Sequence, residues 1–145
     1  MHVLHSCQPP FASVFLAGPT PRDADTPSWR PQAVELLRSL GFQGTVLVPE
    51  RESRTSFDYD DQVEWEFAGL SQATRIAFWV PRDLKTMPAL TTNVEFGYWL
   101  AQSPDRVRYG RPNGAPRTSY LDWLYTKTTG RVPTNDLAHL LQECL

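Results

Sequence analysis

Short apolar runs alternate with segments of helical periodicity along this chain of 145 residues. The apolar runs are rich in β-branched and aromatic residues and are bounded by glycine or proline, which is typical of buried strands. Apolar residues three and four positions apart, with capping residues or proline near their starts, predict helices between the runs. The predicted strands span 13–18, 45–48, 75–80 and 106–109, and the predicted helices span 28–40, 60–72, 91–101, 119–127 and 135–144.

Strands that alternate with helices predict right-handed crossovers and a parallel sheet with helices on both faces. We therefore expect an α/β protein, a single-domain Rossmann- or flavodoxin-like three-layer sandwich with a parallel sheet of about four to five strands. The length fits one domain. Residues 13–145 are assigned to it, and residues 1–12 are expected to form a loose leader.

Composition narrows the function classes. The chain is 41% hydrophobic and 21% charged, with a formal net charge of only -2 and no block of like charges. This argues against a nucleic acid polymer as partner. The longest apolar runs are too short for a membrane span, and the first residues lack a secretory pattern, so we expect no membrane association and a cytoplasmic location. Cys7 and Cys144 lie at opposite ends of the sequence, and a disulfide between them is not expected.

In open parallel sheets, ligands bind at the carboxyl ends of the strands. Glu95 falls in the first turns of a predicted helix at this edge, where the helix dipole favours a carboxylate. The alternative is a capping box, in which Thr91 or Thr92 is the N-cap and Glu95 only completes the cap.

Glu66 lies on the preceding predicted helix, so both carboxylates can converge beside the third strand. A pair of carboxylates is the usual equipment for cleaving a glycosidic bond. The alternative is that Glu66 belongs to a solvated helix face with Asp61, Gln62 and Glu64.

The turn after the first strand offers ligand-binding groups. Gly18 lets the backbone approach a ligand closely, and Thr20 and Arg22 can hold hydroxyls or a phosphate. The alternative is an ordinary proline-rich turn. Dinucleotide and Walker motifs are absent, and three scattered histidines favour neither a metal site nor a catalytic triad. We expect most tryptophans, Trp65, Trp79, Trp99 and Trp123, to be core residues.

Three motifs, in order, resemble the nucleoside 2-deoxyribosyltransferases and the related nucleoside 5'-monophosphate N-glycosidases. They span 14–22 (VFLAGPTPR), 62–66 (QVEWE) and 91–97 (TTNVEFG), within a similarity over roughly residues 13–125. The resemblance implies that Glu95 is the nucleophile and that Glu66 stands where the family usually has Asp. Thr92 and Asn93 are assigned to substrate binding from the same motif. Phe15 replaces a frequent Tyr, which favours the nucleotide hydrolases.

The resemblance also implies that Arg22 binds a 5'-phosphate and that Ser119 is lent to the site of a neighbouring subunit. It therefore implies a homodimer or a larger homo-oligomer. It implies no metal and no organic cofactor. The partner is expected to be a small-molecule nucleoside or nucleotide.

In the implied mechanism, Glu95 forms a covalent glycosyl ester that another nucleobase or water resolves. The sequence leaves transferase and hydrolase equally open. A non-catalytic nucleotide-binding module on the same fold is the alternative function, and it is favoured if Glu95 only caps its helix. A flavin-binding flavodoxin-like domain is a third possibility, although no sequence feature indicates flavin.

Overall fold

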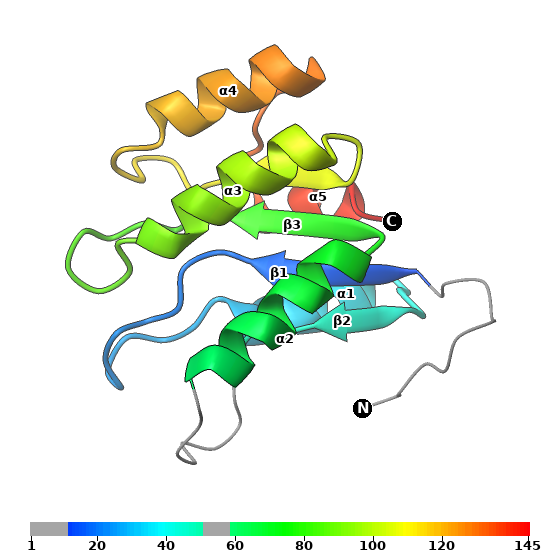
Figure 1. Cartoon of the computed structure of the whole chain (residues 1–145), viewed down its shortest axis with the longest axis horizontal. Helices are drawn as coiled ribbons and strands as arrows, with labels where there is room; N and C mark the ends of the chain where they lie inside the picture. The colour runs from blue at the N-terminus through cyan, green and yellow to red at the C-terminus, as the bar shows by residue number, and fades with distance from the viewer. Residues whose placement is uncertain (1–11, 51–58) are drawn as a thin grey trace.

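The computed structural model describes residues 12–50 and 59–145 (Figure 1). Its sheet has four parallel strands in the order β2-β1-β3-β4. Each predicted strand is confirmed to within about one residue, as β1 (Ser13–Ala17), β2 (Thr45–Leu47), β3 (Arg75–Trp79) and β4 (Val107–Gly110). The helices are α1 (Arg30–Ser39), α2 (Tyr59–Gln72), α3 (Leu90–Gln102), α4 (Ser119–Thr129) and α5 (Leu137–Gln142). The predicted leader lies, but for residue 12, outside the described residues.

The helices form a layer on each side of the sheet. Helices α2, α3 and α4 cover one face, and α1 and α5 cover the other (Figure 1). Because successive side chains of a strand point to opposite faces, Phe15 and Ala17 enter the first core, whereas Val14 and Leu16 enter the second. Strands buried on both faces read as continuous apolar runs, as observed. The predicted three-layer Rossmann- or flavodoxin-like fold is confirmed.

The order of the strands places a crevice at one point of the sheet. From β1 the chain crosses through α1 to β2 on one side, and then through α2 to β3 on the other side of β1. The carboxyl ends of β1 and β3 therefore flank the point at which the winding reverses. Ligands of doubly wound sheets bind outside the strands at this point.

Gly69 sets how closely α2 approaches the sheet. A Cβ at this position would lie 2.9 Å from the ring of Phe15. Since real side chains do not pack at that distance, any other residue would push α2 away from β1 or displace the aromatic ring. The glycine thus keeps Glu66, one helical turn earlier, close to the end of β1.

The outer helices leave several large apolar side chains in solvent. Trp79 and Trp99 are buried as expected, but the core assignment is wrong for Trp65 and Trp123, which are 44% and 56% exposed. Trp123 lies on α4, and Trp65 lies on α2 with its ring centroid 6.2 Å from that of Phe15, so it contacts the core only at its edge. On α3, Val94 is 72% exposed, because the buried face is formed by a different set, Thr92, Phe96, Trp99 and Leu100. Within the described ranges, the helices include none that meets the length and apolarity of a membrane span.

Candidate active site

A cavity of about 400 Å³ lies at the carboxyl ends of β1 and β3. Its walls come from segments that the sequence separates widely: the end of β1 with its following turn, Arg30 at the start of α1, Pro49 after β2, the first half of α2, and the loop before α3 with the first turns of that helix. A pocket of this size is in the range that holds a small organic ligand. The predicted location of the site is therefore matched by a cavity.

The turn after β1 is shaped by close contact with β3. Gly18 has φ +150°, and a Cβ there would lie 2.1 Å from the carbonyl oxygen of Trp79 and 2.9 Å from the ring of Trp29. Only glycine fits this conformation and this space. Gly18 lines the cavity, but what requires a glycine here is the neighbouring strand rather than a ligand.

Thr20 and Arg22 continue this turn along the cavity wall. The backbone N–H of Arg22 donates to the carbonyl of Thr86 at 2.9 Å, which joins the turn to the loop that follows β3. The Arg22 side chain is exposed at the rim, and within residues 12–50 and 59–145 no carboxylate pairs with it. Its charge is thus available to an anionic ligand.

Glu95 belongs to the second turn of α3, and the capping-box interpretation is wrong. The helix begins at Leu90, and its N-cap is Ala89, a residue in the left-handed region (φ 59°) with no side-chain cap. Thr91 and Thr92 are already helical, so neither can act as the N-cap. The side chain of Glu95 instead lines the cavity.

The Glu95 carboxyl is partly buried among charged neighbours. Its pKa is raised from 4.5 to about 7, because burial and the nearby Glu66 carboxylate raise it by more than the Arg30 guanidinium lowers it. A carboxyl with a pKa near neutrality populates both the protonated and the ionised form at physiological pH. Perturbed carboxyls in clefts mark candidate catalytic groups.

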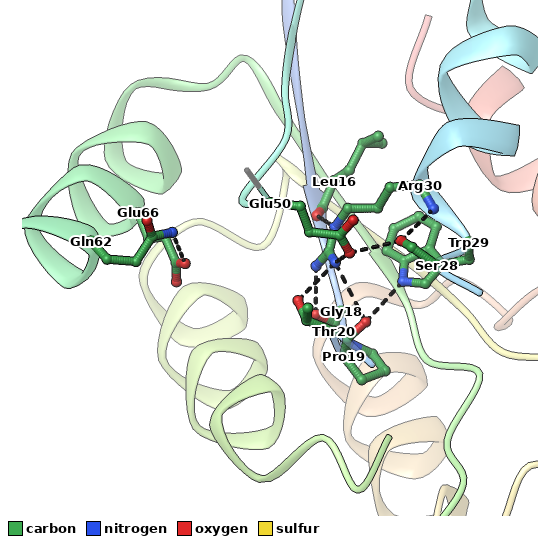
Figure 2. A network of polar contacts seen from close by, with 10 residues as sticks. All are labelled: Leu16, Gly18, Pro19, Thr20, Ser28, Trp29, Arg30, Glu50, Gln62 and Glu66. Atoms are coloured by element: carbon green, nitrogen blue, oxygen red, sulfur yellow. Dashed lines mark hydrogen bonds and ion pairs between the residues drawn. The ribbon is translucent and has the colours of Figure 1, made fainter. Parts of the chain in front are cut away.

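Glu66 faces the same cavity from α2. It is partly buried, whereas Glu64 and Asp61 on the same helix are exposed, so the solvated-face alternative does not apply to it. Its Oε1 accepts a hydrogen bond of 2.6 Å from Gln62 Nε2, one turn earlier (Figure 2). The cavity therefore contains two carboxyl groups from two different helices.

The remaining predicted substrate-binding residues divide into two groups. Phe15 and Thr92 line the cavity, and both are almost completely buried. Asn93 and Ser119 do not line it. The Oδ1 of Asn93 accepts a hydrogen bond from Arg82, which also donates to the carbonyl of Arg117. Ser119 is exposed at the first residue of α4.

Sequence reasoning missed Arg30 and Glu50 altogether as site residues. Arg30 is 1% exposed and lines the cavity, and its Nη1 lies 2.5 Å from Oε1 of Glu50, directly after β2 (Figure 2). The charge-rich stretch 50–59 is typical of a solvent-exposed loop, but the side chain of Glu50 is only 20% exposed. Residues 51–58 of that loop lie outside the described part. Arginine is rarely buried, so the apolar periodicity of the sequence gives no reason to expect this side chain in the site.

A second hollow lies away from these carboxylates. It is an open groove of about 870 Å³ beside α5. Among its charged groups, Arg111 is paired with Asp122 at 2.7 Å and His139 with Glu143 at 3.2 Å. Over the described ranges, no three His, Cys, Asp or Glu side chains are grouped so as to hold a metal ion.

Comparison with known proteins gives one match. A family model described as nucleoside 2-deoxyribosyltransferase like matches residues 12–110. The match covers β1 to β4 and every segment that forms the cavity. No curated protein matches the chain.

Proposed function

Because the chain belongs to the nucleoside 2-deoxyribosyltransferase-like family, we propose that it cleaves the N-glycosidic bond of a (2'-deoxy)nucleoside or its 5'-monophosphate, with Glu95 as nucleophile. The observation that carries this proposal is the carboxyl of Glu95, partly buried in the cavity that a second carboxyl, Glu66, also lines. A pair of carboxyl groups is the usual equipment for cleaving a glycosidic bond.

In the first step, the ionised Glu95 carboxylate attacks C1' of the sugar as the bond from C1' to the base nitrogen breaks. The bonding electrons leave with the base, which takes up a proton, and the transition state resembles an oxocarbenium ion. A glycosyl ester on Glu95 results. We assign to Glu66 the orientation of the sugar or the exchange of this proton, which its position in the lining of the same cavity supports.

In the second step, an acceptor nucleobase or water attacks C1' and releases the Glu95 carboxylate, while the acceptor loses a proton. The two outcomes define a transferase and a hydrolase, and they differ only in which nucleophile reaches the ester. The sequence-based preference for hydrolases rests on Phe15, which offers no hydroxyl to orient the nucleophile. It stays a prediction.

We assign recognition of a 5'-phosphate to the turn after β1. The guanidinium of Arg22 stands at the cavity rim without a carboxylate partner in the described ranges. Pro88 to Thr92, at the start of α3, also line the cavity, and the positive end of a helix favours anions. Arginine suits bidentate contact with phosphate.

We further propose a homo-oligomer in which a second copy covers the outer face of α2 and α3. Large apolar side chains stand exposed on this face, Tyr59, Val63, Phe67, Val94 and Tyr98. Tyr59 and Val63 also line the cavity, so a second copy on this face would help to close it. Light scattering of the purified protein tests this, with Val94→Glu as the variant that breaks the contact. A monomer at all concentrations would contradict it.

Chromatography of the protein incubated with a panel of nucleosides and nucleoside 5'-monophosphates, with and without an acceptor base, tests the proposed activity. Free base released from monophosphates alone identifies a nucleotide hydrolase that uses Arg22. A new nucleoside formed only with the acceptor identifies a transferase. If every substrate remains intact, the proposed activity is wrong and the nucleotide-binding module is favoured.

A further inference from the structure

Arg30 is a buried cation that lines the cavity. It is the first residue of α1, and its side chain is 1% exposed. Burial of a charge is costly unless hydrogen bonds and opposite charges compensate it. The compensation found here comes from the groups that form the site.

The guanidinium donates to four oxygens of β1 and of the turn that follows it, one of them the carbonyl of Pro19 at 3.5 Å. Nε donates to the carbonyl of Leu16 at 2.9 Å, Nη2 to the carbonyl of Gly18 at 2.6 Å, and Nη1 to Oγ1 of Thr20 at 3.0 Å (Figure 2). The Trp29 indole donates to the same turn, to the carbonyl of Pro19 at 3.1 Å. The planar fork of arginine can make these contacts together, which a lysine cannot.

Glu50 links the same guanidinium to β2. Its Oε1 accepts from Arg30 Nη1 at 2.5 Å and from Ser28 Oγ at 2.7 Å. Arg30 therefore ties the carboxyl ends of β1 and β2 together. Since the pair is largely removed from water, its interaction is screened less than that of a surface pair.

Arg30 and Glu95 line the same cavity, so the charge of the guanidinium acts on the Glu95 carboxyl within one pocket. The charged groups described around this cavity are Glu66 from α2, Arg30 from α1, Arg22 from the turn after β1, and Glu50 behind Arg30. Burial and Glu66 raise the pKa of Glu95, and Arg30 is the cation that lowers it. Arginine stays protonated in proteins, so this opposing charge is permanent.

We propose that the Arg30–Glu50 pair is the positioning device of this site: Arg30 fixes the turn after β1 and favours the ionised Glu95 carboxylate, and Glu50 holds Arg30 while offsetting part of its charge. The role of Glu95 as nucleophile rests on the proposed function. The hydrogen bonds of Arg30 and its charge beside Glu95 are independent of the proposed function.

This role predicts opposite effects for the two partners. Arg30→Gln removes the cation, so the pKa of Glu95 rises. Glu50→Gln keeps an oxygen that can accept from Arg30 but removes the negative charge, so the full charge of Arg30 acts on Glu95 and its pKa falls. If the pair served only to hold loops in place, the two substitutions would not shift the pKa of Glu95 in opposite directions.

Carbon-13 NMR titration of the glutamate carboxyl groups measures this in the full chain without any substrate. The Glu95 signal is identified as the one missing from Glu95→Gln. We expect its midpoint to move by about one pH unit upward in Arg30→Gln and by a smaller amount downward in Glu50→Gln. Arg30→Lys, which keeps the charge and loses the fork, should retain a midpoint close to that of the parent protein.

Matched controls lie on the same helix. Arg38 and Glu35 form an ion pair that is 68% exposed on both sides, so Arg38→Gln and Glu35→Gln should leave the Glu95 midpoint unchanged. If Arg30→Gln does not fold, Glu50→Gln decides alone. A Glu95 midpoint that is unmoved or raised in Glu50→Gln would overturn the proposal. Because no turnover is needed, this result stands apart from the outcome of the substrate panel.

Discussion

The cavity at the carboxyl ends of β1 and β3 and the groove beside α5 differ in the surroundings of their carboxyl groups. In the larger groove, Asp136 is exposed and caps α5, and Glu143 lies 3.2 Å from His139. In the cavity, Glu95 sits partly buried beside another carboxyl. Size alone would favour the groove.

The difference indicates that a buried carboxyl with a raised pKa marks a candidate site better than volume does. Pairing lowers the cost of a charge and leaves it little capacity to act on a ligand. A carboxylate that is buried without compensation raises the free energy of the folded protein, and such groups are common at functional sites. The cavity has this property through Glu95, whose pKa is raised by burial and by Glu66.

The largest effect should come from Glu95→Gln, which keeps the shape of the side chain and removes the nucleophile. We expect turnover of the productive substrate to fall by about 10³-fold or more. Steady-state kinetics measures it, with Glu64→Gln on the exposed face of α2 as the matched control. If Glu95→Gln retains most of the activity, Glu95 is not the nucleophile.

The same variant should be more stable than the parent protein at high pH. The raised pKa means that the folded chain holds the Glu95 proton more tightly than the unfolded chain, so ionisation opposes folding as pH rises from 4.5 to about 7. We expect Glu95→Gln to gain about 1–3 kcal/mol in free energy of unfolding at pH 8 and almost nothing at pH 4. Urea unfolding at both pH values measures this. An equal gain at the two pH values would contradict the titration of Glu95.

A smaller effect is expected from Arg22→Ala at the rim of the cavity. Loss of a charge-assisted contact to phosphate should raise KM for a nucleoside 5'-monophosphate about 10-fold and leave the corresponding nucleoside nearly unaffected. Competition kinetics with both substrates measures the ratio. Equal losses on both would remove Arg22 from phosphate recognition.

The smallest effect is expected in the groove. His139→Ala breaks an exposed i,i+4 pair with Glu143 and should change activity by less than about two-fold. A thermal melt run beside the assay separates folding from function. A large loss of activity in a folded His139→Ala protein would move the site toward the groove.

The sequence predicted the layers, the strands and the meeting of Glu66 and Glu95, because these follow from periodicity and from the parallel connection of strands. It predicted the start of α3 to within one residue but not its N-cap, since Ala89 in the left-handed region leaves no recognisable signature. Nor could it show that Asn93 turns to Arg82 rather than to the cavity.

Arg30 shows most clearly what periodicity leaves out. Its burial depends on carbonyl groups at the end of β1 and on Glu50 after β2, which come together only in the folded chain. Likewise, periodicity identified Trp65 and Trp123 as apolar but could not tell which helix faces a single chain leaves open. Tertiary contacts decided both cases.

Acid-quenched mass spectrometry tests the central claim, that Glu95 forms a covalent bond with the sugar, most directly. The protein is mixed with whichever member of the substrate panel reacts, stopped early, and digested. We expect the digest of the parent protein to contain a peptide that includes Glu95 and carries the added mass of the sugar. We expect no such peptide from Glu95→Gln. Base release that continues in Glu95→Gln, with no modified peptide in either protein, would contradict it.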